Sequence, residues 1–279
     1  MKVYRIKSFG DYKRHAERNG SNYQSMVAFQ NSFIKPAQQE FTVKAISYPA
    51  NQQVDLKVDY LYADGNKINW RERLICPVTG LNNRLRASVH VMDMEIGAYP
   101  DSRIYITEQV TPLFSFLEKR YPGLVGSEYL SPDIPSGTVI NEVRHEDMRN
   151  LSFADSSLDH YLSFECFEHI PFYELAITEI YRTLKPDGFF MGTFPFDVNA
   201  PENKIKARLE PDGTITHLTE PEYHGDPVNG KGILCFTIFG WELLDQFRQA
   251  GFKDVYMLMM WSDVYGYLGG EQTFFIARK

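Results

Sequence analysis

From Ser102 onward the chain alternates short apolar runs with amphipathic stretches, and this alternation constrains the fold more than any other feature. The apolar runs predict five strands, at residues 103–107, 124–128, 139–143, 158–163 and 189–194. Apolar residues at helical spacing predict helices at residues 112–121, 172–184 and 241–250, and two closing strands are expected near residues 255–260 and 273–277. Strands that alternate with helices indicate an α/β fold with a mostly parallel, seven-stranded, doubly wound sheet of the Rossmann-like type.

The first hundred residues do not follow this alternation. We therefore expect an N-terminal extension over residues 1–100 and a main domain over residues 101–279. Residues 1–40 are polar and are expected to be helical or partly disordered, whereas residues 41–46 and 54–60 alternate apolar and polar side chains, the period of half-buried strands. The extension is thus predicted to contain a small β-rich element.

One segment of the extension resembles a metal-binding knuckle. Cys76 and Pro77 are followed by Gly80, but Thr79 stands where a second cysteine would be needed. Because threonine is a poor zinc ligand, we predict a tight turn that leads into a helix rather than a metal site. Arg84 and Arg86 on that helix are expected to be solvated, although they could instead hold an anionic group.

Composition narrows the class of partner and the compartment. The formal net charge is -7 and no long run of Lys and Arg occurs, which disfavours a nucleic-acid partner. The 3 cysteines are widely separated and odd in number, which argues against a disulfide framework. The chain starts without the apolar run of a signal peptide, and no apolar stretch approaches the roughly 18–20 residues of a membrane span. A cytoplasmic location is the expectation.

Acidic residues at strand ends suggest where a ligand would bind. In open parallel sheets, ligands lie beyond the carboxyl ends of the strands. Glu128 closes the second expected strand, and a carboxylate there can accept both hydroxyls of a ribose. Asp147 follows the third expected strand with Glu146 and Met148 beside it, and it could accept from an adenine amine while the apolar neighbour covers the ring. Together these residues predict a nucleoside-sized site.

Three linked segments carry a resemblance to a known family. They are the run from Glu146 to Asp159, the tetrapeptide Glu168-His169-Ile170-Pro171, and the run from Glu179 to Gly188. At this spacing the chain from Ser102 to Lys279 resembles class I S-adenosylmethionine-dependent methyltransferases of the type 11 kind. The resemblance implies S-adenosyl-L-methionine as cofactor and methyl transfer to a small-molecule acceptor, and it makes residues 197–232 an acceptor-side insertion.

One position departs from the family pattern. A glycine-rich turn normally follows the first strand and lets the backbone approach the cofactor. Here the matching positions read Glu108-Gln109-Val110-Thr111-Pro112, without a glycine. Either side chains of this loop hold the cofactor, or the protein is a non-catalytic binding or scaffold protein on a methyltransferase-like fold. A nucleotide-binding oxidoreductase is a third alternative, which the missing glycines and the run through Lys185-Pro186 oppose.

The resemblance and the strand-end argument together define the candidate site. The expected cofactor-binding residues are Thr107, Glu108, Gln109, Glu128, Tyr129, Glu146, Asp147, Met148, Ser163 and Phe164. The catalytic candidates are His169, as general base, and His224 in the insertion. No metal site is predicted, because His224 and Asp226 lack a third ligand in the sequence. Cys166 is expected to be a packed residue.

The nature of the acceptor is a further expectation. The long insertion and the acidic charge favour a soluble acceptor of modest size, methylated on oxygen. A sugar, a glycan precursor or a secondary metabolite fits this description. Self-association into a homo-oligomer is left open.

Overall fold

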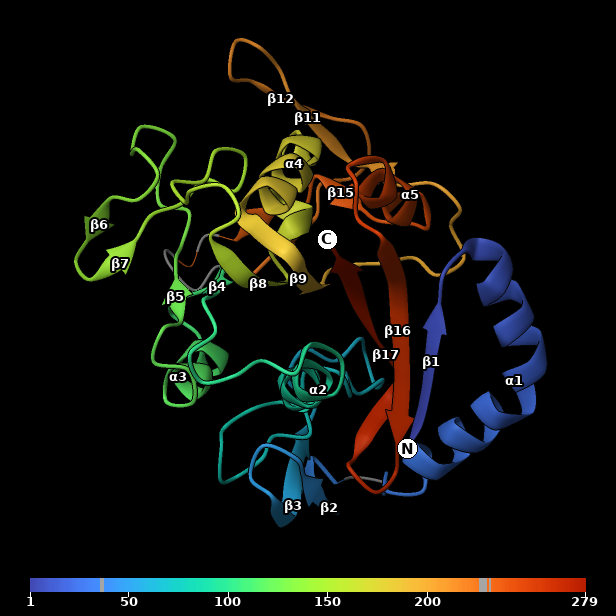
Figure 1. Ribbon diagram of the computed structural model, residues 1–279. Helices are drawn as coiled ribbons and strands as arrows, with labels where there is room; N and C mark the ends of the chain where they lie inside the picture. Colours follow the sequence, from blue (N-terminus) through green and yellow to red (C-terminus); the bar gives the residue numbers. More distant parts are fainter. Residues whose placement is uncertain (36–37, 226–229, 231) are drawn as a thin grey trace. The chain divides into compact units, whose positions relative to one another are not determined.

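The computed structural model of the protein describes residues 1–35, 38–225, 230 and 232–279 (Figure 1). The chain divides into two compact units that are each discontinuous in sequence. The first comprises Met1–Ile6, Gly10–Gly97 and Met257–Phe274, and the second comprises Lys7–Phe9, Ala98–Tyr256 and Phe275–Lys279. The first unit thus contains most of the expected N-terminal extension together with a segment from the end of the chain.

A seven-stranded sheet contains strands from both ends of the chain. Its order is β1-β16-β17-β9-β8-β4-β5. The bounds are β1 Lys2–Ile6, β16 Asp254–Ser262, β17 Tyr267–Arg278, β9 Leu184–Thr193, β8 Leu158–Phe164, β4 Ile104–Ile106 and β5 Val125–Gly126. Strands β5, β4, β8 and β9 pair in parallel, whereas β17 pairs with β9, and β1 with β16, in antiparallel fashion. The expected seven-stranded α/β sheet is confirmed.

The prediction of a third sheet strand at residues 139–143 is wrong. These residues form a small antiparallel hairpin of β6 (Val139–Ile140) and β7 (Val143–Arg144), turned by Asn141 and Glu142 at positive φ. Val139 and Ile140 are exposed, so their apolar character does not reflect burial in a sheet. The seventh strand is instead β1, from the region expected to be a helical or disordered lead-in.

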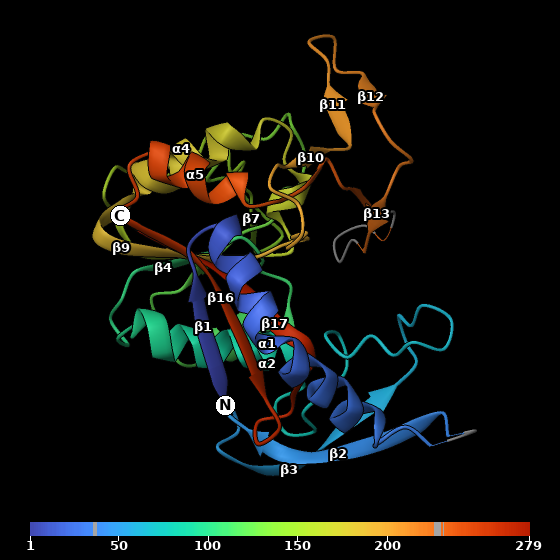
Figure 2. The ribbon, with the colours of Figure 1, turned by 90° about the vertical axis from the view of Figure 1, so that its right-hand side faces the viewer.

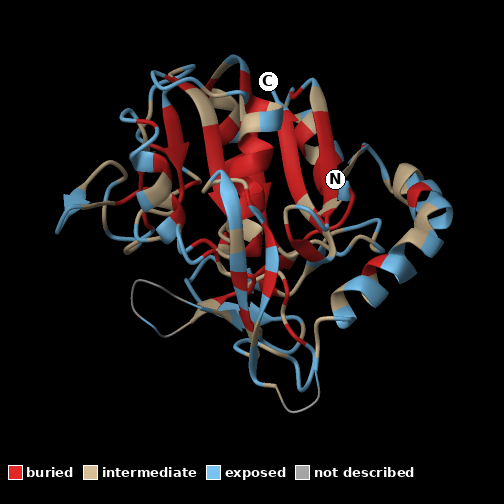
Figure 3. Ribbon diagram, turned by 90° about the horizontal axis from the view of Figure 1, so that it is seen from below, coloured by how far each residue is buried: buried red, intermediate tan, exposed pale blue. Residues whose placement is uncertain are grey.

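The second unit is packed around aromatic side chains. Helix α4 (Tyr173–Thr183) buries Ile177 and Ile180, and helix α5 (Glu242–Gln249) buries Phe247. The Phe247 ring lies 4.6 Å from that of Phe275 on β17. Helix α3 (Pro112–Glu118) begins at its proline, with the Thr111 side chain accepting from the backbone of the first turn. Figure 3 shows the sheet strands as largely buried.

The first unit is a hairpin and two helices that pack on the antiparallel strands. It contains α1 (Phe9–Asn31, from Gly10 onward), β2 (Glu40–Ser47), β3 (Gln52–Asp59), α2 (Asn83–Val91) and the π-helical turn η1 (Met92–Ile96). The hairpin β2–β3, visible in Figure 2, confirms the predicted β-rich element. Its inward face joins Leu74 and Leu268 in one buried cluster. No helix in the described part of the chain is long and apolar enough to cross a membrane.

The prediction that Arg84 and Arg86 of helix α2 are both solvated is wrong for Arg86. Its side chain is fully buried in the first unit and donates to the carbonyl oxygens of Leu74 (3.2 Å), Tyr265 (2.8 Å) and Gly266 (3.1 Å). Burial lowers the pKa of the guanidinium to about 10, despite the nearby Tyr267. Arg84 is half-buried and pairs with Glu72. A ring of backbone carbonyls therefore replaces solvent around Arg86.

Two buried histidines make stability depend on pH. Burial lowers the pKa of His90 in the first unit, and of His160 in the second, from 6.5 to about 4. Because the pKa of each histidine is lower in the folded than in the unfolded protein, its contribution to stability is present above pH 6.5 and is lost as the pH falls towards 4. When the pH drops from about 7 to about 5, we expect the free energy of unfolding to fall by about 2 kcal/mol for each histidine. Urea unfolding at both pH values measures this decrease.

A pair of histidine variants checks this expectation. His160→Gln removes the titrating ring and should reduce the loss for the second unit, whereas His217→Gln changes an exposed side chain on strand β12 (Ile215–His217) and should leave the loss as it is. An unchanged pH dependence in His160→Gln would contradict the assignment.

Candidate functional site

The loop after β4 is held in shape by side chains where the family uses glycines. One oxygen of Glu128, Oε1, accepts from the backbone N–H groups of Gln109 (2.7 Å) and Val110 (2.9 Å). The Gln109 amide in turn donates to the carbonyl of Glu142 and accepts from the N–H of Arg144. The loop is therefore fixed by one carboxylate and one amide, which explains how it keeps its position without glycine.

The expected residues at the ends of β4 and β8 are buried. Thr107 donates from its hydroxyl to the hydroxyl of Ser163 at 3.1 Å, and both side chains are shielded from solvent. Phe164 is buried next to Ser163, while Glu108 is half-buried in the loop. Thr107 and Ser163 thus connect the two strands at their carboxyl ends.

Glu146 is occupied by contacts within the protein. Its carboxylate, which is fully buried, accepts from Arg144 Nε (2.8 Å), from the N–H of Ser152 (2.9 Å) and from the Ser152 hydroxyl. The backbone N–H of Glu146 donates to the carbonyl of Glu128 at 3.2 Å. Glu146 therefore positions the chain after β7 next to β5, and its carboxylate is held by donors within the protein.

Asp147, Met148 and Tyr129 lie near this network. Asp147 is paired with Arg149 through two nitrogens, Nε at 3.0 Å and Nη2 at 2.7 Å. Burial alone would raise the pKa of Asp147, but the hydrogen bonds from Arg149 outweigh it and hold the pKa below its usual value. Met148 is buried, whereas Tyr129 is half exposed and contacts the His145 ring. Asp147 and Tyr129 therefore each offer a partly exposed polar group.

The two catalytic candidates lie side by side in the second unit. His169 ends a short 3-10 turn, η2 (Phe167–His169), and His224 lies in β13 (Tyr223–His224), which pairs with β14 (Ile233–Leu234). Their ring centroids are 4.9 Å apart. The structure therefore brings together two residues that the sequence had only placed on the same side of the fold.

Glu168 is a functional candidate that the sequence reasoning missed. Its Oε1 lies 3.3 Å from His224 Nδ1 and 3.5 Å from His169 Nε2. Glu168 belongs to the motif Glu168-His169-Ile170-Pro171, but the motif alone indicates no role for the glutamate. The only sequence signal was its position next to His169, because the approach of His224 depends on the tertiary fold.

Neighbouring groups and burial shift the pKa values of His224 and Cys166. The hydrogen bond to Glu168 raises the pKa of His224, burial opposes this rise, and Glu222 adds to it with Oε1 at 3.2 Å from Nε2. Burial raises the pKa of the Cys166 thiol to about 12, so the thiol stays protonated. Cys166 contacts the sulfur of Met148 at 3.9 Å, which agrees with a packed residue.

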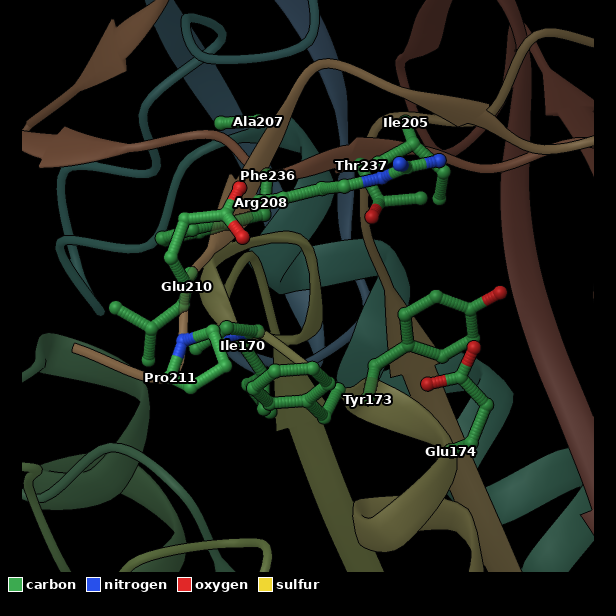
Figure 4. A pocket seen from close by; sticks show the side chains of 13 residues that line it. Ile170, Tyr173, Glu174, Ile205, Ala207, Arg208, Glu210, Pro211, Phe236 and Thr237 are labelled. Atoms are coloured by element: carbon green, nitrogen blue, oxygen red, sulfur yellow. The ribbon is translucent and has the colours of Figure 1, made fainter. Parts of the chain in front are cut away.

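The insertion builds one wall of a recess. Its strands β10 (Lys204–Ile205) and β11 (Ala207–Leu209) lie opposite the start of α4, and β10 pairs with β15 (Thr237–Ile238). The recess has a volume of about 430 Å³, and Figure 4 shows its walls. Its lining combines apolar with polar side chains, among them Ile170, Phe172, Ile205, Leu209 and Phe236 on one hand and Tyr173, Glu174, Arg208 and Glu210 on the other. Asp226 and Pro227 of the expected covering loop lie outside the described residues.

Comparison with known proteins finds a family model that matches the central segment of the chain. Residues 128–192 match the model of the methyltransferase domain, from Glu128 at the end of β5 to Gly192 in β9. This match confirms the resemblance that the sequence motifs indicated for this segment. No curated protein matches the chain.

Several solved structures match this chain at low identity. An S-adenosylmethionine dependent methyltransferase from Mesorhizobium loti is 13% identical, with a TM-score of 0.42 over 70% of this chain and 97% of its own. DesVI from Streptomyces venezuelae is 12% identical, with a TM-score of 0.42 over 70% and 91%. The 1,6-didemethyltoxoflavin-N1-methyltransferase of Burkholderia thailandensis, solved with 1,6-didemethyltoxoflavin and S-adenosylhomocysteine bound, is 16% identical, with a TM-score of 0.39 over 70% and 77%.

Proposed function

We propose that this chain, whose residues 128–192 match a methyltransferase domain, transfers a methyl group from S-adenosyl-L-methionine to a small-molecule acceptor. The family match carries the proposal, since it begins at Glu128 and includes Asp147 and His169. We further propose that the acceptor atom is an oxygen of a sugar, a glycan precursor or a secondary metabolite. A cytoplasmic location stays a prediction from the sequence, and self-association into a homo-oligomer stays open.

The residues beyond β4 and β5 fit the nucleoside part of this cofactor. Asp147 is ionised and partly exposed, so it can accept from an exocyclic amine, and the half-exposed Tyr129 offers the face of a ring. Glu128 already shares Oε1 with two loop amides, so its second oxygen would have to bind the ribose. The loop from Thr107 to Gln109 would contact the methionine part through side chains instead of a glycine backbone.

The acceptor side is assigned to the recess and the neighbouring histidines. The cofactor supplies, when bound, a methyl group on a positively charged sulfur, and the protein must orient the acceptor and remove its proton. Ile170, which follows His169 directly, lines the recess, as does Phe236, whose N–H donates to the Glu168 carbonyl at 2.8 Å. His169 Nδ1 faces the carbonyl of Leu234 and must carry the proton there, which leaves Nε2 able to accept one.

The alternative from another class is a non-catalytic binding or scaffold protein on this fold. The glycine-free loop favours it, because the side chains of Glu128, Glu146 and Gln109 already accept hydrogen bonds from backbone N–H groups of the protein. The two functions differ in whether the cofactor binds at all.

Calorimetric titration of S-adenosylmethionine and S-adenosylhomocysteine tests the proposal. We expect both to bind the full chain, and Asp147→Ala to weaken each by about tenfold or more, equivalent to about 1.4 kcal/mol. The matched control is Asp212→Ala, which removes the same charge from the exposed turn between β11 and β12. Thermal unfolding of each variant establishes that it is folded.

Each result has a defined meaning. A folded chain that binds neither ligand overturns the proposal and supports the scaffold alternative. Binding that Asp147→Ala leaves unchanged rejects the placement of the adenine at Asp147 while keeping the methyltransferase proposal.

A further inference from the structure

We propose that Glu168, His169 and His224 form a binding site for a divalent transition-metal ion of the zinc class. One ligand atom from each of the three lies within 4.8 Å of the others in the second unit. The proposal concerns metal binding itself and does not rest on the proposed methyl transfer.

The backbone holds the three side chains in place. Glu168 and His169 are neighbours in η2, directly after the parallel strand β8. His224 is paired with Ile233 in the β13–β14 ladder. Two hydrogen bonds join η2 to β14 and the residues after it: His169 Nδ1 donates to the Leu234 carbonyl at 2.8 Å, and the N–H of Phe236 donates to the Glu168 carbonyl.

In each histidine, the ring nitrogen that does not face Glu168 donates a hydrogen bond. A carbonyl oxygen can only accept, so the Leu234 carbonyl fixes the proton of His169 on Nδ1. For His224 the carboxylate of Glu222 accepts from Nε2 at 3.2 Å. In the neutral rings, the lone pairs are therefore on His169 Nε2 and His224 Nδ1. Both of these nitrogens face the same oxygen of Glu168.

This arrangement puts three electron-pair donors together around a buried charge. The Glu168 side chain is 0% exposed, and among the described residues its oxygens have no hydrogen-bond partner apart from the two histidine nitrogens that face Oε1. A buried carboxylate whose charge is not compensated is strongly destabilising. A cation between the two nitrogens and the carboxylate compensates that cost, and protons on the two inner nitrogens are the competing solution.

Distances and ligand types identify the class of ion. Two ligand atoms at about 2.0–2.1 Å from a tetrahedral ion lie about 3.4 Å apart. The two distances from Glu168 Oε1, 3.3 Å and 3.5 Å, match this edge. Two imidazoles with one carboxylate suit Zn²⁺ and similar transition metals, whereas Mg²⁺ and Ca²⁺ require mostly oxygen ligands.

The second layer of contacts also fits a metal site. Histidines that bind metals commonly donate their other N–H to a backbone carbonyl or a carboxylate, which fixes the ring and increases its basicity. Here the Leu234 carbonyl and Glu222 have these positions, and Glu222 is itself paired with Lys206. His224 is 26% exposed, so solvent reaches the cluster.

Three protein ligands leave a fourth coordination position for water or another small oxygen ligand. If the methyl-transfer proposal also holds, a hydroxyl bound there would lose its proton more readily, since a metal ion lowers the pKa of a bound oxygen. His169 would then be a ligand instead of the base, and the proton of the acidified hydroxyl would pass to solvent water. Metal binding and methyl transfer are nevertheless measured separately.

The test is a titration of the full chain after dialysis against a chelator. We expect calorimetry to show one Zn²⁺ per chain at micromolar or tighter affinity, Co²⁺ to give the visible absorption of a tetrahedral complex, and millimolar Mg²⁺ not to bind. Glu168→Gln, His169→Ala and His224→Ala should each weaken Zn²⁺ binding by about tenfold or more. His217→Ala, on exposed strand β12 of the same insertion, is the matched control and should bind as the original chain does.

Two outcomes would overturn the proposal. One is the absence of stoichiometric binding of both Zn²⁺ and Co²⁺ to the folded chain. The other is retention of full affinity in His224→Ala, which would mean that the ion binds elsewhere. His224 lies on a partly exposed hairpin, so this variant remains informative even where Glu168→Gln fails to fold.

Discussion

Gly240→Ala is expected to destabilise the second unit by about 3 kcal/mol or more, because the added methyl group overlaps main-chain atoms. A Cβ at this position would lie 2.3 Å from the carbonyl oxygen of Glu202 and 2.6 Å from that of Ala200. These carbonyls cannot move easily, since the Gly240 N–H donates to Asn203 and the Trp241 N–H donates to Ala200. Urea unfolding of the full chain, followed by circular dichroism, measures the loss.

Two other glycines serve as controls for this variant. A Cβ at Gly225, in the same unit, or at Gly20, in helix α1, would meet no atom within 4 Å. Gly225→Ala should therefore be nearly neutral. Gly20→Ala should stabilise the chain by roughly 0.5–1 kcal/mol, since glycine is a poor helix former. A loss below about 1 kcal/mol in Gly240→Ala would contradict the steric argument.

Arg86→Ala is expected to cost the first unit about 3–5 kcal/mol. The substitution leaves the carbonyls of Leu74, Tyr265 and Gly266 without this donor and opens a cavity in a fully buried place. Arg86→Met fills much of the volume but supplies no donor, so it separates the two contributions. Chemical denaturation of the three proteins under identical conditions gives the comparison.

Arg84→Ala is the control for Arg86. This side chain lies on the same helix, is only partly buried and pairs with Glu72 at 2.9 Å. Its loss should cost about 1 kcal/mol or less, as is usual for such pairs. If the Arg84 and Arg86 variants lost the same stability, the carbonyl ring around Arg86 would not have the energetic importance assigned to it.

Local patterns in the sequence predicted much of the fold. The strands β4, β8 and β9 and the helices α4 and α5 have strong apolar periodicity, and the structure confirms them. The prediction of a strand at residues 139–143 failed because Val139 and Ile140 are apolar yet exposed. A parallel bridge joins Glu128 to His145 at that edge of the sheet. The role of β1 depends on pairing with β16 from the far end of the chain, which periodicity does not report.

The candidate site was predicted less completely than the fold. Motif positions singled out Glu128, Asp147 and His169, which come within a few residues of the ends of β5, β7 and β8. The function of Glu128 as an anchor for the glycine-free loop could not be foreseen, because it depends on the direction of two backbone N–H groups. The meeting of Glu168 with His224 likewise depends on where the insertion folds back.

The recess has walls of two origins, and this affects how the protein can change its specificity. One wall, Ile170–Glu174, precedes and begins α4 and belongs to the segment that matches the methyltransferase domain, whereas the other comes from β10 and β11 in the insertion. Exchanges at Ile205, Arg208 or Leu209 can reshape the cavity without touching Glu128 or Asp147. If the recess holds the acceptor as proposed, selectivity for one small molecule over another can change while affinity for the methyl donor is retained, which makes these three positions the ones to randomise in a directed-evolution library.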